Sequence, residues 1–316
     1  MPTDILNLFS QPTARWFKDK LGVPTKVQED TWPAIASGHP VLVSAPTGTG
    51  KTLSAFLVFI DRLYAMAQEG TLKEELYLIY VSPLKSLAGD IRENLNRPLD
   101  GIRHEMERLE GAVHMAGSAR PPQTARAAES ARPPQTACPA ESVCLDIQVG
   151  IRTGDTPQKD RQRMVKHPPH ILIITPESLY LMLTSMTGQK VLRTARAVII
   201  DELHALIDTK RGAHLMLSIA RLDRLCERPL QRIGLSATIE PLELAAAYLS
   251  PEPAVICAPS MEKQIRIEIL GTTPAQGRRK DPVWEELGQA VYRQCLSCRS
   301  VIDFSEGRRY AEKLAY

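Results

Sequence analysis

The sequence predicts an α/β protein built on a mostly parallel β-sheet with helices on both faces. Three observations indicate this fold class. Short apolar runs alternate with helical patterns over residues 40–260, which is typical of strands joined by crossover helices. The apolar runs are continuous rather than alternating, as expected of strands buried on both faces. A glycine-rich loop stands between the first run and a long amphipathic pattern.

The elements can be assigned in order along the chain. The first forty residues look helical and are broken by Leu-Gly-Val-Pro at 21–24. Strands are expected at 41–43, 76–81, 145–151, 171–174, 197–200 and 231–235. Helices are expected after the glycine loop and at 87–95, 100–109 and 178–184, together with a basic helix near 159–166 and a long helix that ends at about Cys226.

A tandem repeat interrupts this alternation. Residues 119–130 and 131–142 are near copies that differ at positions 126/138 and 127/139. Two copies are too few for a solenoid. Proline pairs and the lack of large apolar residues favour a disordered surface loop, so residues 117–142 are predicted to be an insertion in a folded domain.

The chain is expected to contain two domains of unequal completeness. Residues 1–250 form the first, and Pro251, Pro253 and Pro259 mark a linker over 251–264. A second unit over 265–316 is expected to contain strands at 265–270 and 301–304 and two helices. One or two strand–helix units cannot close a core of their own, so this unit is interpreted as the start of a larger domain.

Composition excludes little. The formal charge of +3 over 316 residues neither supports nor excludes binding to a polyanion. The opening residues do not resemble a signal peptide, and no apolar run approaches the roughly 20 residues of a membrane span. We therefore expect a cytoplasmic protein with reduced thiols and no membrane partner. Cys295 and Cys298 are interpreted as an accidental pair, because no second pair stands at metal-ligand spacing.

The glycine loop at 45–52, Ala-Pro-Thr-Gly-Thr-Gly-Lys-Thr, predicts a nucleotide phosphate site. Gly48 and Gly50 let successive N–H groups point at an anion, and the following helix N-terminus adds positive charge. Lys51 can reach the β- and γ-phosphates, and the Thr52 hydroxyl can bind Mg²⁺. A glycine turn without a ligand is the alternative.

Asp201 and Glu202 follow an apolar strand, 150 residues after Lys51. Asp201 would hold Mg²⁺, and Glu202 would orient or deprotonate the attacking water. Capping of a helix N-terminus is the alternative for this pair. Ser236-Ala237-Thr238 ends a neighbouring strand, where short hydroxyls can bond to the acidic loop; turn or capping use is the alternative there.

Further polar groups follow other strands. Gln28 has both a donor and an acceptor, so it can bind the N6 and N7 edge of adenine, although it can also be an ordinary helix-surface residue. Parallel strands would bring a set of residues to one sheet edge, where they suit a sugar–phosphate chain, with turn chemistry as the alternative for each. This nucleic-acid set is Pro83, Lys85, Arg152, Thr153, Gly154, Thr175 and Pro176.

Taken together, these motifs resemble superfamily 2 helicases. Pro24-Thr25…Gln28, 45–52, 82–87, 175–177, 201–204 and 236–238 are similar, in order, to the Q motif and motifs I, Ia, Ib, II and III. The finer resemblance is to Lhr-like (large helicase-related) DEAD/DEAH-type helicases, through 149–156, 201–206 with 210–214, and 231–238. Residues 300–312 resemble motif IV, which opens the second domain of such helicases.

This resemblance implies two RecA-like P-loop NTPase domains, with ATP and Mg²⁺ between them and single-stranded nucleic acid crossing both. ATP hydrolysis would drive strand separation, with a role in DNA repair. Gln28, Asp201 and the loop residues Thr47, Gly48, Thr49, Gly50, Lys51 and Thr52 would bind the nucleotide. Thr52 and Asp201 would hold the metal, and Lys51, Asp201 and Glu202 would act in catalysis. His204, Ser236 and Thr238 would couple hydrolysis to strand movement.

Two departures from the family pattern leave alternatives open. The tandem insertion is foreign to it, and motifs V and VI, including an arginine finger, are missing after motif IV. Loss of such a finger costs roughly 10³- to 10⁵-fold in rate. The alternatives are an active DNA helicase, a module that binds ATP and nucleic acid without turnover until a separate chain supplies motifs V and VI, and an RNA helicase. The polymer would be single-stranded DNA, a DNA-containing duplex, RNA or an RNA–DNA hybrid.

Overall fold

The computed structural model describes residues 4–83, 87–117, 146–237, 239–259, 267 and 282–315. The chain divides into two compact units, Met1–Ser260 and Met261–Tyr316. The first unit carries every strand in the described part of the chain. The predicted insertion at 117–142 and the predicted strand at 265–270 lie almost wholly outside the described residues.

A seven-stranded sheet, in the described residues, organises the first unit. Its order is β3-β4-β2-β5-β6-β1-β7, and every pairing in it is parallel. The strands are β1 (Val41–Ser44), β2 (Leu78–Val81), β3 (Val149–Arg152), β4 (Ile171–Ile174), β5 (Ala197–Ile200), β6 (Gln231–Ser236) and β7 (Val255–Cys257). The predicted α/β class with a parallel sheet is confirmed.

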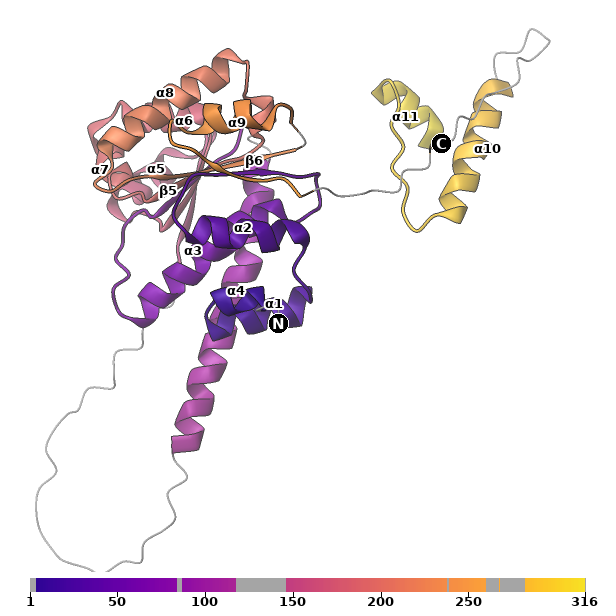
Figure 1. The fold of residues 1–316 in the computed structure, drawn as a ribbon. Helices are drawn as coiled ribbons and strands as arrows, with labels where there is room; N and C mark the ends of the chain where they lie inside the picture. Colours follow the sequence, from indigo (N-terminus) through magenta and orange to yellow (C-terminus); the bar gives the residue numbers. More distant parts are fainter. Residues whose placement is uncertain are drawn as a thin grey trace, which may run out of the picture. The chain divides into compact units, whose positions relative to one another are not determined.

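Helices cover both faces of the sheet (Figure 1). On one face lie α1 (Gln11–Leu21), α2 (Lys26–Ala36), α3 (Lys51–Gln68) and α4 (Leu87–Gly117). On the other lie α6 (Pro176–Leu183), α7 (Met186–Leu192), α8 (Lys210–Leu225) and α9 (Leu242–Leu249). Strand residues alternate between the two cores: Ile171 and Ile173 belong to the first, whereas Leu172 and Ile174 belong to the second. Burial on both faces explains the continuous apolar runs.

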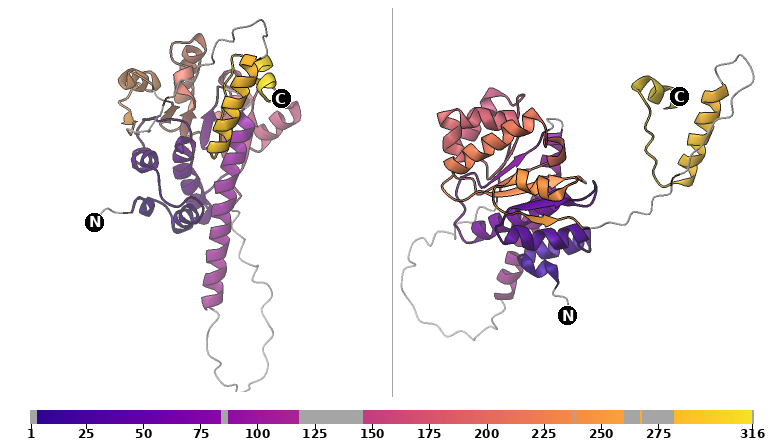
Figure 2. Two further views of the ribbon diagram at one scale, coloured as in Figure 1. Left: turned by 90° about the vertical axis from the view of Figure 1, so that its right-hand side faces the viewer. Right: turned by 45° about the horizontal axis from the view of Figure 1, so that its top comes forward.

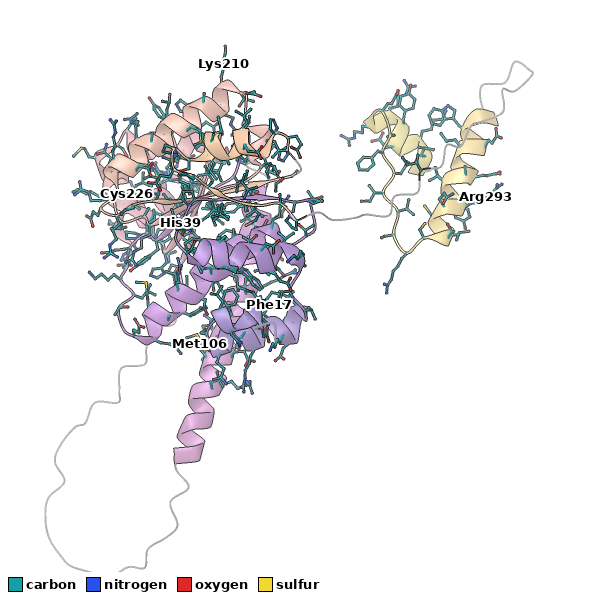
Figure 3. All side chains as sticks on the ribbon, viewed as in Figure 1. Phe17, His39, Met106, Lys210, Cys226 and Arg293 are labelled. Carbon is teal, nitrogen blue, oxygen red and sulfur yellow. The ribbon has the colours of Figure 1, made fainter. Side chains whose placement is uncertain are left out.

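An aromatic cluster attaches the N-terminal helices. The short 3₁₀ helix η1 (Ile5–Leu8) precedes α1. The Phe17 ring packs edge-on against Trp32 of α2 at 5.3 Å between centroids, and Figure 3 labels Phe17 among the side chains below the sheet. Trp32 is fully buried.

Helix α4 differs from the prediction, because residues 87–117 form one helix rather than two (Figure 2). Pro98 lies inside it and removes one backbone donor. The buried positions Ile91, Leu95, Leu99, Ile102 and Met106 nevertheless continue at helical spacing on both sides of the proline. Tertiary packing of this apolar face therefore outweighs the local break.

Two further predictions are corrected. The linker predicted at 251–264 contains β7, in which Val255 pairs with Val41 of β1. This segment forms a strand because the edge of β1 offers it hydrogen-bonding partners. The strand expected at 301–304 is absent from the described structure, in which these residues have no regular conformation. Phe304 is 90% exposed, and a strand needs a hydrogen-bonded neighbour, which no described residue of the second unit supplies.

The second unit contains α10 (Pro282–Ser297) and α11 (Arg308–Ala315). The Trp284 and Tyr310 rings stack at 5.4 Å between centroids, and the Lys313 ammonium lies 4.4 Å from the Trp284 ring centre. These contacts join the two helices of this unit. None of the described helices is long and apolar enough to cross a bilayer.

Candidate functional site

Polar residues gather where the strands end. After four of the described strands, β1, β2, β4 and β5, the next residue continues the ladder by donating its N–H to the end of the neighbouring strand. The bonds are Ala45 to the Ser236 carbonyl (3.2 Å), Asp201 to Val81 (2.9 Å), Ser82 to Ile174 (3.0 Å) and Thr175 to Arg152 (3.4 Å). The glycine loop, the acidic pair and part of the predicted nucleic-acid set therefore share one sheet edge, which is where parallel α/β sheets bind ligands.

The glycine loop has the backbone expected of an anion cradle. Gly48 and Gly50 have φ values of +81° and +85°, and a side chain at Gly48 would meet nothing within 4 Å. Gly50 stands at the start of α3, where no side-chain cap hydrogen bond is formed. The first N–H groups of this helix thus remain available to an anion. The Thr49 hydroxyl donates to the Pro46 carbonyl at 2.8 Å and fixes the turn.

Lys51 lies between the loop and the acidic pair. Its ammonium donates to the Ala45 carbonyl. Burial lowers the pKa of Lys51, while the negative charges of Glu202 and Asp201 act in the opposite direction. The lysine and both carboxylates therefore lie within electrostatic reach of one another, as the sequence hypothesis requires.

Both oxygens of the Asp201 carboxylate are held in place. Oδ1 accepts from the Glu202 N–H at 2.9 Å, and Oδ2 accepts from the Tyr80 hydroxyl at 2.5 Å. Burial raises the pKa of Asp201, the Tyr80 hydrogen bond opposes this, and the charge of Glu202 adds to it. Sequence analysis missed Tyr80, since it stands inside an apolar run.

Glu202 has a left-handed backbone, with φ 49° and ψ 45°. For a residue with a side chain this conformation costs of order 1–3 kcal/mol, and such strain clusters at functional sites. A Glu202 oxygen lies 3.4 Å from His204 Nδ1. The same nitrogen accepts from the Ala237 N–H at 3.2 Å and lies 3.4 Å from the Ser236 hydroxyl. His204 of the short helix η2 (Leu203–Ala205) thus joins the acidic loop to the end of β6.

Gln28 lies against the glycine loop but is engaged in capping α2. Its Oε1 accepts from the Thr25 N–H at 2.9 Å, and the Thr25 hydroxyl bonds in turn to the Thr49 carbonyl at 3.1 Å. A Cβ on Gly50 would lie 2.9 Å from Gln28 Nε2. The structure places Gln28 beside the predicted phosphate site, with its acceptor oxygen used by the capping box.

The donor set suits magnesium held with a nucleotide. No group of three or more His, Cys, Asp or Glu side chains forms a metal cage among the residues searched. Mg²⁺ typically binds through one or two protein oxygens together with phosphates and waters. Thr52 and Asp201 would provide that number: the Tyr80 hydroxyl that bonds to Asp201 Oδ2 also lies near the Thr52 side chain.

The predicted nucleic-acid residues form a second group at the same edge. Burial lowers the pKa of Arg152, and the neighbouring Arg161 charge lowers it further, so two guanidinium groups lie close together. Arg161 of α5 (Gln158–Lys166) also bonds to the Gly154 carbonyl at 2.7 Å. The 153–156 turn is closed by the Thr153 N–H, which donates to the Thr156 hydroxyl at 2.8 Å.

The remaining members differ in accessibility. Thr175 is 2% exposed, and its hydroxyl donates to Ser178 at 3.0 Å. Pro83 and Pro176 are buried. The Thr175 N–H also bonds to the Arg152 carbonyl, and its own carbonyl accepts from the Leu179 N–H at 3.0 Å, so neither the hydroxyl nor the backbone of Thr175 is open to a polymer. Lys85 and Thr238 lie outside the described residues.

Comparison with known proteins agrees with this arrangement. The DEAD/DEAH box helicase family model matches residues 25–133 and 135–245, a span that contains the glycine loop, the acidic pair and β6. The chain therefore belongs to the DEAD/DEAH box helicases. The resemblance to Lhr-like helicases is confirmed as well.

The relatives include Lhr proteins of bacteria and archaea. The chain is 41% identical over 313 residues to the Lhr helicase/probable uracil glycosylase of Mycolicibacterium smegmatis, covering 98% of this chain and 18% of that protein. It is 36% identical over 327 residues to the ATP-dependent helicase Lhr-Core protein 2 of Thermococcus barophilus, covering 99% of this chain and 34% of that one. The chain thus spans a fifth to a third of these relatives.

Solved structures show the same fold. Mycobacterium smegmatis helicase Lhr, bound to ssDNA and AMP-PNP, superposes with a TM-score of 0.75 and 40% identity over 99% of this chain and 36% of that one. The DUF1998 helicase MrfA, at 20% identity, shares the fold with a TM-score of 0.67 over 99% of this chain and 40% of that chain.

Proposed function

We propose that the first unit binds ATP with Mg²⁺ and hydrolyses it as the first motor domain of a helicase that moves on single-stranded DNA. The observation that carries this proposal is the meeting of Lys51 with Asp201 and Glu202 at one sheet edge, beside an uncapped helix start. The M. smegmatis structure, with its ssDNA and AMP-PNP, supports the choice of ligands.

In this proposal the loop supplies the phosphate contacts. N–H groups of Gly48 to Thr52 surround the phosphates, and the α3 N-terminus adds positive charge. The Lys51 ammonium leaves the Ala45 carbonyl and takes a phosphate oxygen instead. Thr52 and Asp201 would hold Mg²⁺, which would supply charge neutralisation to the phosphoryl oxygens.

Glu202 orients the attacking water and accepts its proton. His204 contacts Glu202 and the end of β6, so a change at the acidic loop is transmitted to Ser236 and Ala237. We propose this contact as the link between hydrolysis and movement, in which Thr238 also takes part.

The Arg152 and Arg161 pair and the 153–156 turn are proposed to contact the sugar–phosphate chain, with Thr175, Pro83, Lys85 and Pro176 beside them. Because these groups address phosphate and sugar rather than base edges, binding would be largely independent of sequence. Residues 261–316 are proposed to begin the second motor domain, and the intact system to act in DNA repair.

The proposal is tested by ATP turnover in the purified chain with and without single-stranded DNA. Turnover should rise with DNA and be lost in Lys51→Ala, whereas Lys190→Ala, which removes an exposed lysine of α7, should keep it. Matched RNA strands separate a DNA motor from an RNA motor. Absence of nucleotide binding in the unaltered chain would refute the site itself.

A second candidate is a module that binds ATP and nucleic acid without turnover of its own. The chain spans only 18% of one Lhr relative and 34% of another. These relatives therefore contain further sequence, beyond the matched part, that could supply residues needed for catalysis in them. Binding without hydrolysis, restored by adding a chain that carries motifs V and VI, would favour this candidate.

A further inference from the structure

Tyr80 lies at the centre of the candidate site, but the proposed function gives it no role. It lies in β2, fully buried. Its hydroxyl donates to Asp201 Oδ2 at 2.5 Å, and the Thr52 side chain lies near enough to influence the same hydroxyl. One phenol therefore lies beside the two residues that are suited to magnesium, although they come from α3 and from the end of β5.

The Tyr80 ring is fixed from the side as well as at its tip. It stacks on Phe56 with 4.8 Å between centroids and 20° between planes. Phe56 is 2% exposed and stands one helical turn after Thr52 on α3. This stacking restrains the ring, so the Tyr80 hydroxyl is held in place beside Asp201.

Asp201 has its other oxygen fixed by the Glu202 N–H. Removal of the Tyr80 hydroxyl would free Oδ2 and allow the carboxylate to rotate about its Cβ–Cγ bond. The peptide ladder on either side of Tyr80 would be unchanged, since β2 pairs with β4 and β5 through backbone atoms.

We propose that Tyr80 is a positioning residue, whose hydroxyl holds the Asp201 carboxylate in the orientation that binds Mg²⁺ together with Thr52 and a nucleotide. This inference rests on the proposed function of the same site. Outer groups that orient metal ligands typically contribute 10- to 100-fold to metal affinity, which sets the expected size of the effect.

The test is a magnesium titration of fluorescent ADP binding, which needs no turnover. Tyr80→Phe should raise the Mg²⁺ concentration at half-saturation about tenfold, while ADP affinity in EDTA stays as in the unaltered chain. Tyr77→Phe is the matched control: it removes another buried hydroxyl from the same segment, one that accepts from the Lys73 N–H at 3.1 Å, away from the acidic pair.

A second arm separates positioning from general packing. In an Asp201→Asn background, Tyr80→Phe should leave the Mg²⁺ requirement unchanged, because the carboxylate it orients is already gone. This pair of variants also serves if Tyr80→Phe alone does not fold. An equal Mg²⁺ requirement in Tyr80→Phe and the unaltered chain, or a shift that persists in the Asn background, overturns the inference. Failure of the unaltered chain to bind ADP would instead overturn the proposed site.

Discussion

At the scale of single residues, the acidic pair combines two kinds of constraint. Asp201 is held through its side chain, by one backbone and one phenol donor. Glu202 is held through its backbone, in a left-handed conformation. Neighbouring residues thus have orientations set by independent means, which allows one to serve a cation and the other a water.

His170, away from the site, gives a pH-dependent prediction. Burial lowers the pKa of His170, and its Nδ1 accepts from the Gln148 N–H at 2.9 Å, so the folded state holds the neutral ring. Below about pH 6.5 the unfolded chain takes up a proton that the folded chain resists. The free energy of unfolding should therefore decrease as pH falls from about 6.5, with a slope of at most about 1.4 kcal/mol per pH unit from this group.

Denaturant unfolding between pH 7.5 and 5.5 measures this effect. His170→Asn should reduce the loss of stability on acidification relative to the unaltered chain. Equal slopes in the unaltered chain and His170→Asn would show that this imidazole does not contribute.

The sequence was sufficient for residues whose role follows from local spacing. The positions of Gly48, Gly50 and Lys51 between a strand and a helix follow from the loop itself. Tyr80 could not be found in this way, because its bond to Asp201 spans 121 residues and depends on the pairing of β2 with β5. The use of Gln28 in a capping box is likewise visible only once the start of α2 is known.

At the scale of elements, the start of α8 is tightly packed against the acidic loop. Arg211 makes two bonds to the Glu177 carboxylate of α6, at 2.6 and 3.1 Å. Gly212 lies so close to the preceding turn that a Cβ would stand 1.9 Å from the Leu206 carbonyl oxygen. A backbone atom cannot move aside cheaply, so glycine is required here by proximity rather than by φ.

We predict that Gly212→Ala lowers the free energy of unfolding by about 1–3 kcal/mol, as overpacking of a filled site does. The comparison is Gly89→Ala in α4, where a Cβ meets nothing within 4 Å; this change should be neutral or stabilise by up to about 1 kcal/mol. Chemical denaturation of both variants measures the difference. Equal stabilities would contradict the packing described at Gly212.

Strands were predicted well where a continuous apolar run marks a buried strand, as in β2, β4 and β5. The errors arose where tertiary structure decides. Packing of its apolar face keeps α4 continuous through Pro98. Part of the predicted linker forms β7 because it can pair with the free edge of β1. At 301–304, apolar composition suggested a strand, yet the described residues offer it no partner.

At the scale of the whole molecule, β6 lies between β1, which leads into the glycine loop, and β5, which leads into the acidic pair. Ser44 stands beside Ser236, and Ile200 beside Gly234. The two halves of the proposed phosphate site therefore follow strands that are not adjacent but flank a third one, whose end contacts His204.

Both apolar cores and all described candidate site residues belong to the first unit. We predict that residues 1–260 alone fold, bind ADP as the full chain does, and keep the same melting temperature to within the ~2–4 °C that 1 kcal/mol represents at this size. Scanning calorimetry and ADP binding test this. A larger decrease in Tm would show that residues 261–316 contribute to the stability of the sheet.

The left-handed backbone of Glu202 bears on the stability of this chain. Folding alone would favour glycine or asparagine at this position. Glu202 instead places a carboxylate oxygen 3.4 Å from His204 Nδ1. The backbone strain is therefore the energetic cost of placing a carboxylate at the proposed ATPase site.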